Sequence, residues 1–103
     1  MDTAEDRAKV FRAKVNLETS QIAWKDLQPY FASGVTLAIA NDLDLVEVAF
    51  QMSEDNAKQI QQWMTEGRFN KVSDEQAGVW YDTDALVWAV VVSPWVLVQQ
   101  VHK

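Results

Sequence analysis

The sequence predicts an α+β fold, with a mostly antiparallel sheet of about four strands packed by three to four helices. The strongest indication is the stretch ALVWAVVVSPWVLV over residues 85–98, in which only Ser93 and Pro94 are not apolar. Its β-branched residues are typical of strands buried on both faces. A second indication is the apolar residues at helical spacing that precede it. The chain has 103 residues, 49% of them hydrophobic and 23% charged, so residues 1–103 are expected to form one domain.

The first helix is expected over residues 3–17. Ala4, Ala8, Phe11 and Val15 recur at helical spacing, and charged residues fill most other positions. Because this apolar stripe is narrow, we expect the helix to dock on another element instead of forming the core.

A second helix is predicted within residues 20–33, with Trp24, Leu27 and Phe31 on one face. Proline is tolerated best in the first turn of a helix, and Pro29 therefore makes Asp26 a candidate cap. The residues before Asp26 would then form a turn or a separate short helix.

Two strands are predicted in the middle of the chain. Residues 35–40 alternate between two faces, and residues 45–52 alternate again. One side of the second segment consists of Val46, Val48, Phe50 and Met52. Asn41 and Asp42 offer a turn between the segments, so an antiparallel hairpin is expected.

Two further helices follow in the prediction. One begins at Ser53 or Asp55 and runs through Glu66. Its buried stripe consists of Ile60, Trp63 and Met64. The other covers residues 73–81 and begins with the capping pattern S-D-E-Q.

The apolar stretch is too long to be one straight strand. At about 3.3 Å per residue, residues 85–101 would measure roughly 56 Å, whereas a domain of about 100 residues has a radius of gyration near 13 Å. We therefore expect two antiparallel strands, 86–92 and 95–100, with a cis-proline turn or a bulge at Ser93-Pro94.

Both faces of these two strands carry apolar residues, so each face needs a cover. The cover is expected to be the N-terminal helix, another layer of this chain or a second subunit. We therefore expect a homodimer, or a hydrophobic groove for a protein partner.

The net charge of −6 is unevenly distributed. Residues 1–25 hold five basic and four acidic side chains, whereas residues 26–103 hold four basic and eleven acidic ones. Such a surface repels phosphate backbones and anionic membranes, so neither nucleic acid nor membrane is expected as a partner. The chain has no cysteine and no apolar leader at its start, which favours a cytoplasmic location.

Several segments together resemble a family of small bacterial proteins known only as a domain of unknown function. These segments are NLETSQIAWKDLQPYFASG, DLDLVEVA, QQWMTEGRF, VSDEQAGVW and ALVWAVVVSPWVLVQ. The resemblance covers about residues 14–100, so residues 1–13 lie outside it. It implies a bacterial origin and a cytoplasmic location, and it supplies no catalytic residue.

Carboxylates are the first candidates for chemistry. The pairs Asp42-x-Asp44 and Asp82-x-Asp84 offer oxygen ligands, but both lie in expected turns, where aspartate is common. No metal and no cofactor are therefore expected. Glu47 is flanked by apolar residues and would be a binding or acid–base group if it faced a concave surface. The alternation alone predicts that it points to solvent.

Aromatic residues are the second group of candidates. Trp80 and Trp95 are the tryptophans whose place the pattern leaves open, so they are candidate stacking surfaces, although core packing is the simpler role. His102 is the only histidine and is next to last, which excludes a Ser-His-Asp arrangement. The glycine-rich phosphate-binding motifs are absent.

Three functions compete on these grounds. The first is a small, non-catalytic protein-interaction or assembly module, which the apolar strands favour. The second is a protein that binds a small molecule or a metal. The third is an enzyme that uses a carboxylate such as Glu47 or Asp44. An acidic mimic of nucleic acid is a remote fourth possibility.

Overall fold

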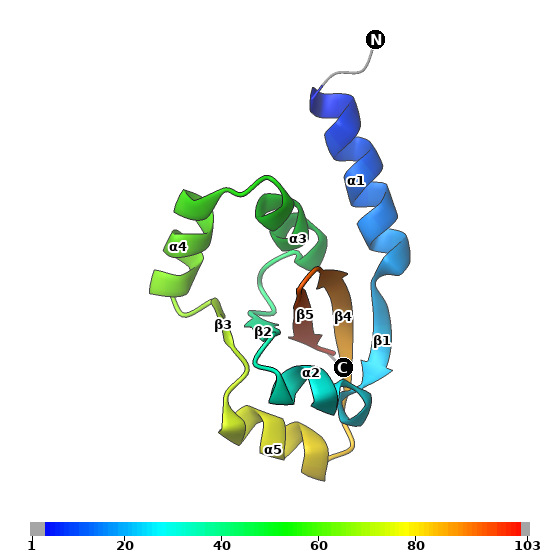
Figure 1. The fold of residues 1–103 in the computed structure, drawn as a ribbon, viewed down its shortest axis with the longest axis vertical. Helices are drawn as coiled ribbons and strands as arrows, with labels where there is room; N and C mark the ends of the chain where they lie inside the picture. Colours follow the sequence, from blue (N-terminus) through cyan, green and yellow to red (C-terminus); the bar gives the residue numbers. More distant parts are fainter. Residues whose placement is uncertain (1–3, 102–103) are drawn as a thin grey trace.

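A computed structural model of the chain describes residues 4–101, including the side chains of residues 6–14 and 19–101. The helices and strands are, in chain order, α1 (Ala4–Glu18), β1 (Ser20–Ala23), the 3-10 helix η1 (Trp24–Leu27), α2 (Gln28–Ala32), β2 (Thr36–Ile39), α3 (Leu45–Ser53), α4 (Ala57–Thr65), β3 (Phe69–Lys71), α5 (Asp74–Asp82), β4 (Leu86–Val92) and β5 (Trp95–Gln100). Figure 1 shows their arrangement.

The described strands form one five-stranded sheet in the order β1-β4-β5-β2-β3. Three of the neighbouring pairs are antiparallel, and β2 and β5 run parallel. The α+β class and the mostly antiparallel sheet are therefore confirmed, with five strands where about four were expected and, among the described residues, five α-helices where three to four were expected.

Helices of this chain cover both faces of the sheet. Side chains of α3 and α4 share one buried cluster with the strands, and side chains of η1, α2 and α5 share the cluster on the other face; Figure 1 shows where these helices lie. We call the two faces the α3/α4 face and the α2/α5 face. Both faces of the apolar strands are thus covered in the middle of the sheet by the same chain, so the strands do not by themselves require a second subunit. Toward the two ends of β4, the side chains of Leu86 and Val91 are 51% and 62% exposed.

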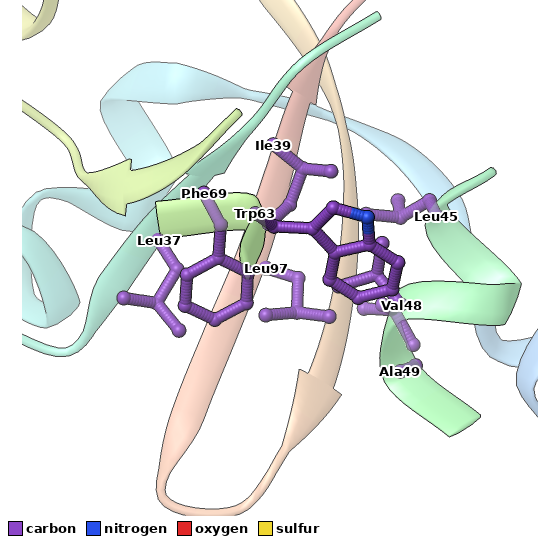
Figure 2. Close-up of a cluster of buried hydrophobic side chains, with 9 residues drawn as sticks. Leu37, Ile39, Leu45, Val48, Ala49, Trp63, Phe69 and Leu97 are labelled. Atoms are coloured by element: carbon purple, nitrogen blue, oxygen red, sulfur yellow. The ribbon is translucent and has the colours of Figure 1, made fainter. Parts of the chain in front are cut away.

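The α3/α4 face holds one of two buried clusters. Leu37, Val90 and Leu97 come from the strands, and Val48 and Trp63 come from the helices. Figure 2 shows the indole of Trp63 pointing from α4 toward side chains of α3. Trp63 thereby packs both helices onto the sheet, because a tryptophan buries more apolar area than other side chains.

The second cluster lies on the α2/α5 face and is built around Trp24, which is fully buried. The ring centroids of Trp24 and Trp80 lie 5.0 Å apart, and Phe31 meets Trp24 edge-on at 5.6 Å. These aromatic contacts hold η1, α2 and α5 together. The predicted shared face of Trp24, Leu27 and Phe31 is confirmed, since Trp24 and Leu27 are buried and Phe31 packs against them.

The predicted strand over residues 45–52 is wrong, because this segment is α3. Leu45, Val48 and Ala49 are its buried residues, and they follow helical spacing and not the alternation that predicted a strand. Asp44 caps the helix by accepting a hydrogen bond from the N–H of Val46 at 2.9 Å. The hairpin between residues 35–40 and 45–52 is therefore wrong as well.

The strand predicted at residues 35–40 is confirmed as β2, which pairs with β3 and β5. The short edge strands β1 and β3 were not expected. Residues 20–23, expected to lie in a turn or short helix, form β1, and η1 follows. Pro29 lies in the first turn of α2 as predicted, but Leu27 is the cap in place of Asp26.

The other predicted elements agree closely with the structure. Ser73 caps α5 by accepting a hydrogen bond from the N–H of Gln76 at 3.0 Å. The helix expected from Ser53 or Asp55 begins at Ala57, after Asn56 as its cap. The strands at 86–92 and 95–100 pair in an antiparallel hairpin, and the Ser93–Pro94 peptide bond is cis.

α1 extends away from the rest of the chain, as Figure 1 shows. It contacts α3, where the rings of Phe11 and Phe50 meet edge-on with centroids 5.7 Å apart. The prediction that this helix, with its narrow apolar stripe, docks on another element is therefore confirmed. Val10, near the middle of α1, remains 69% exposed.

Candidate functional site: a groove beside α4

A groove of about 560 Å³ opens on the α3/α4 face, between α4, β3 and the β4–β5 hairpin. Its walls are mainly apolar. They include Leu37, Met52, Ile60, Met64, Val92 and Trp95. Polar residues, among them Asp55, Asn56 and Lys71, also line it. Among the cavities described for this chain, we regard this groove as the candidate functional site.

One stripe of α4 forms a wall of the groove. Ala57, Ile60, Gln61 and Met64 line it, and their spacing places them on one side of the helix. Trp63 points instead into the core and is 8% exposed. The predicted buried stripe is therefore correct for Trp63 and wrong for Met64, which is 48% exposed.

The turn between α3 and α4 holds the start of this wall in place. The side-chain amide of Asn56 donates to Gln51 Oε1 at 2.8 Å, while its own oxygen accepts from the N–H of Gln59 at 3.3 Å. Gln51 in turn donates to Glu47 at 2.8 Å. This chain of hydrogen bonds joins the first turn of α4 to α3.

The opposite wall is formed by β3 and β2. Phe69 lies opposite Ile39 and Lys71 lies opposite Leu37, so these four side chains share the α3/α4 face. Arg68, just before β3, lies 2.9 Å from Asp42 and 3.0 Å from Glu66. The hydrogen bonds to Glu66 and then Asp42 raise the pKa of this guanidinium.

The predicted site residues do not come together in the structure. Of the four, Trp95 lines the groove. Trp80 lies on the opposite face of the sheet, 5% exposed and packed against Trp24. Asp44 is a helix cap, and Glu47 lies on α3, not in a strand, 2.9 Å from Arg12.

One aspartate of each pair lies in a turn, as the sequence indicated: Asp42 and Asp84 do, whereas Asp44 caps α3 and Asp82 is the last residue of α5. Asp42 pairs with Arg68, and Asp84 has a positive φ of 54° and lies 3.4 Å from Lys25. Within residues 4–101, no three acidic or histidine side chains gather as metal ligands would. His102 lies outside the described residues.

Methionines of the groove were missed as site residues by sequence reasoning. The sequence predicts Met52 in a strand and Met64 in a buried stripe. The available signal is the spacing of Ala57, Ile60 and Met64, which puts these apolar residues on a side of α4 next to that of Trp63.

The described helices include none that is long and apolar enough to cross a membrane.

Comparisons with known proteins point to one family. Residues 10–100 match the family described as “Protein of unknown function (DUF2288)”. The solution NMR structure of PA1075 from Pseudomonas aeruginosa has 35% sequence identity to this chain and a TM-score of 0.80, and the match covers 100% of this chain and 95% of that one. No curated protein matches the chain in sequence.

Proposed function

This chain belongs to the DUF2288 family of proteins of unknown function, and we propose that it is a small, non-catalytic protein-interaction module. In this proposal, the groove beside α4 receives apolar side chains of a protein partner. The observation that carries it is an apolar groove that the chain leaves open on the α3/α4 face, beside the buried cluster of that face.

Methionine supports a protein partner. Met52 and Met64 both line the groove, and Met64 is 48% exposed. Unbranched, polarisable methionine side chains adapt to different partner shapes and are common on binding surfaces. Trp95, half-buried in the same groove, belongs to the residue type most enriched at the centres of interfaces.

The two candidate carboxylates favour a non-catalytic role. Glu47 is held by Arg12 and Gln51, and Asp44 is held by the backbone of α3. Neither lines the groove. A carboxylate-dependent enzyme would need such a group desolvated beside a substrate site, so it is the weaker alternative.

A small apolar molecule is the second candidate for the groove. Its volume of about 560 Å³ lies within the range of roughly 300–1,000 Å³ that is typical of small-molecule sites. A second copy of this chain is a third candidate, which would make the protein a homodimer.

A bacterial origin and a cytoplasmic location accompany the proposal, supported by the Pseudomonas aeruginosa structure and by the absence of cysteine.

The experiment uses a display library of short randomised peptides selected on the whole protein. Selected peptides are then measured against Met64→Glu and against Val79→Glu, a matched control on α5 with 52% exposure. We expect Met64→Glu to weaken binding by at least about tenfold, because a charge enters an apolar contact. The control should leave binding unchanged.

Two results would contradict the proposal: the recovery of no peptide, and equal binding by both variants. If no peptide binds and small apolar compounds give a thermal shift that Met64→Glu abolishes, the small-molecule function is favoured. Sedimentation at micromolar concentration tests the second copy, since Met64→Glu should dissociate a dimer formed through the groove.

A further inference from the structure

The backbone of β3 faces β2 on one side only. The N–H of Val72 donates to the Thr36 carbonyl at 3.2 Å, and the N–H of Ala40 donates to the Arg68 carbonyl at 3.0 Å. In an antiparallel ladder, successive residues turn their backbone groups alternately toward and away from the partner strand. Phe69 and Lys71 therefore direct their N–H and C=O groups away from β2.

These outward groups have no partner within the described chain. β3 is the last strand of the sheet, and no hydrogen bond found among the described residues engages the backbone of Phe69 or Lys71. An unpaired strand edge is a template for another strand. The shortness of β3 and the charge of Lys71 limit indiscriminate pairing, so selective addition needs further contacts.

The groove supplies such contacts. Phe69, Lys71 and Leu37 all border it, and a strand added to β3 would lie only about 4.8 Å farther out. Every second side chain of that strand would point to the α3/α4 face, beside Met64 and Ile60 on α4. The other edge of the sheet, β1, does not border the groove.

The negative charge of the chain indicates which charge the partner should carry on the side chains that do not enter the groove. Eleven of the fifteen charged side chains in residues 26–103 are acidic. Asp55, which lines the groove, forms no ion pair with a described residue. A basic segment would complement this field, and an acidic one would be repelled.

We propose that the partner binds as an extended strand added to the free edge of β3, with apolar side chains at alternate positions in the groove and basic residues among the others. This inference rests on the proposed function and names the partner's conformation and chemistry. Backbone hydrogen bonds to Phe69 and Lys71 would supply affinity, and the groove would supply selectivity.

The test compares Lys71→Pro with Lys71→Ala, using the selected peptides. Proline removes the N–H that points outward and leaves the hydrogen bonds between β2 and β3 intact, a position at which edge strands tolerate proline. Lys71→Ala removes the same side chain and keeps the N–H. We expect Lys71→Pro to weaken binding by roughly tenfold relative to Lys71→Ala, because a hydrogen bond is lost and the ring obstructs the edge.

A second measurement leaves the protein unchanged, in case Lys71→Pro does not fold. Each selected peptide is N-methylated at one position at a time. A strand that uses one edge should lose affinity at alternate positions and tolerate methylation at those between them. The most enriched sequences should carry basic residues.

The outcomes separate the two proposals. If Met64→Glu weakens binding but Lys71→Pro does not and N-methylation shows no alternation, the groove binds its partner in another conformation and this inference is wrong. Acidic peptides among the best binders would overturn its charge requirement. If Met64→Glu has no effect, the proposed function itself fails.

Discussion

The guanidinium of Arg12 on α1 lies 2.9 Å from the carboxylate of Glu47 on α3. The same guanidinium lies 4.4 Å from the ring centroid of Phe50. Arg12 therefore attaches α1 to α3 through an ion pair and a cation–π contact, next to the Phe11–Phe50 pair. Glu47, a candidate functional residue in the sequence, thus helps to position the projecting helix.

Glu47→Gln is expected to destabilise the protein by less than about 1 kcal/mol, because both partners of this ion pair are substantially exposed. The Arg12 and Glu47 side chains are 43% and 38% exposed. Urea unfolding at low and high salt measures the effect, which should shrink as salt screens the pair. A marked stabilisation by Glu47→Gln would instead indicate a costly buried charge and would revive the enzymatic alternative.

Trp24→Ala is expected to destabilise the protein by about 3–5 kcal/mol, as for other large-to-small substitutions in cores. Trp24 is fully buried, and its indole N–H has no hydrogen-bond partner among the described residues. Trp24→Phe should cost clearly less, because it keeps an aromatic ring and removes the unsatisfied donor. Thermal unfolding of the two variants gives the comparison, and an equal loss would contradict this account.

Gly78→Ala and Gly67→Ala should have opposite effects on stability. A Cβ at either position meets no atom within 4 Å. Gly78 lies inside α5, where alanine is favoured over glycine by roughly 1 kcal/mol. Gly67 has a φ of +74°, a conformation that costs other residues about 1–2 kcal/mol. Chemical unfolding of both variants tests this, and a shared sign would contradict the backbone assignments.

Asp44→Ala should destabilise the protein by about 0.5–2 kcal/mol, because it removes the cap of α3. Asp82→Ala is the control: it removes a negative charge from the C-terminal residue of α5, where the helix dipole disfavours it, so it should be neutral or slightly stabilising. Circular dichroism during thermal unfolding follows both variants. If Asp44→Ala had no effect, the capping hydrogen bond would not contribute to stability.

Local signals in the sequence were enough for several elements. The β4–β5 hairpin follows from an apolar stretch that is too long for one strand. The start of α5 follows from the capping pattern at Ser73, and the first turn of α2 follows from Pro29. Each of these signals lies within a few neighbouring residues, so no distant contact was needed to interpret it.

The error at α3 shows where local patterns are ambiguous. In LVEVAFQMS, Leu45, Val48 and Ala49 follow helical spacing, while Val46, Val48 and Phe50 follow strand spacing. Asp44 and Glu47, three residues apart, resemble the start of a capping box and were the signal that favoured a helix. Burial decides between the two spacings: Leu45, Val48 and Ala49 are buried in the cluster, whereas Val46 is only partly buried against it and Phe50 contacts Phe11 of α1.

The sequence by itself determined the fold class and the hairpin at the centre of the sheet, because long apolar segments with clear turn and capping residues allow few alternatives. Tertiary structure decided the edge strands β1 and β3, the parallel pairing of β2 with β5, and the groove beside α4. Strands of three or four residues gain most of their stability from the neighbour they pair with. A groove likewise depends on the distance between segments that are far apart in the sequence, and a local sequence pattern does not determine that distance.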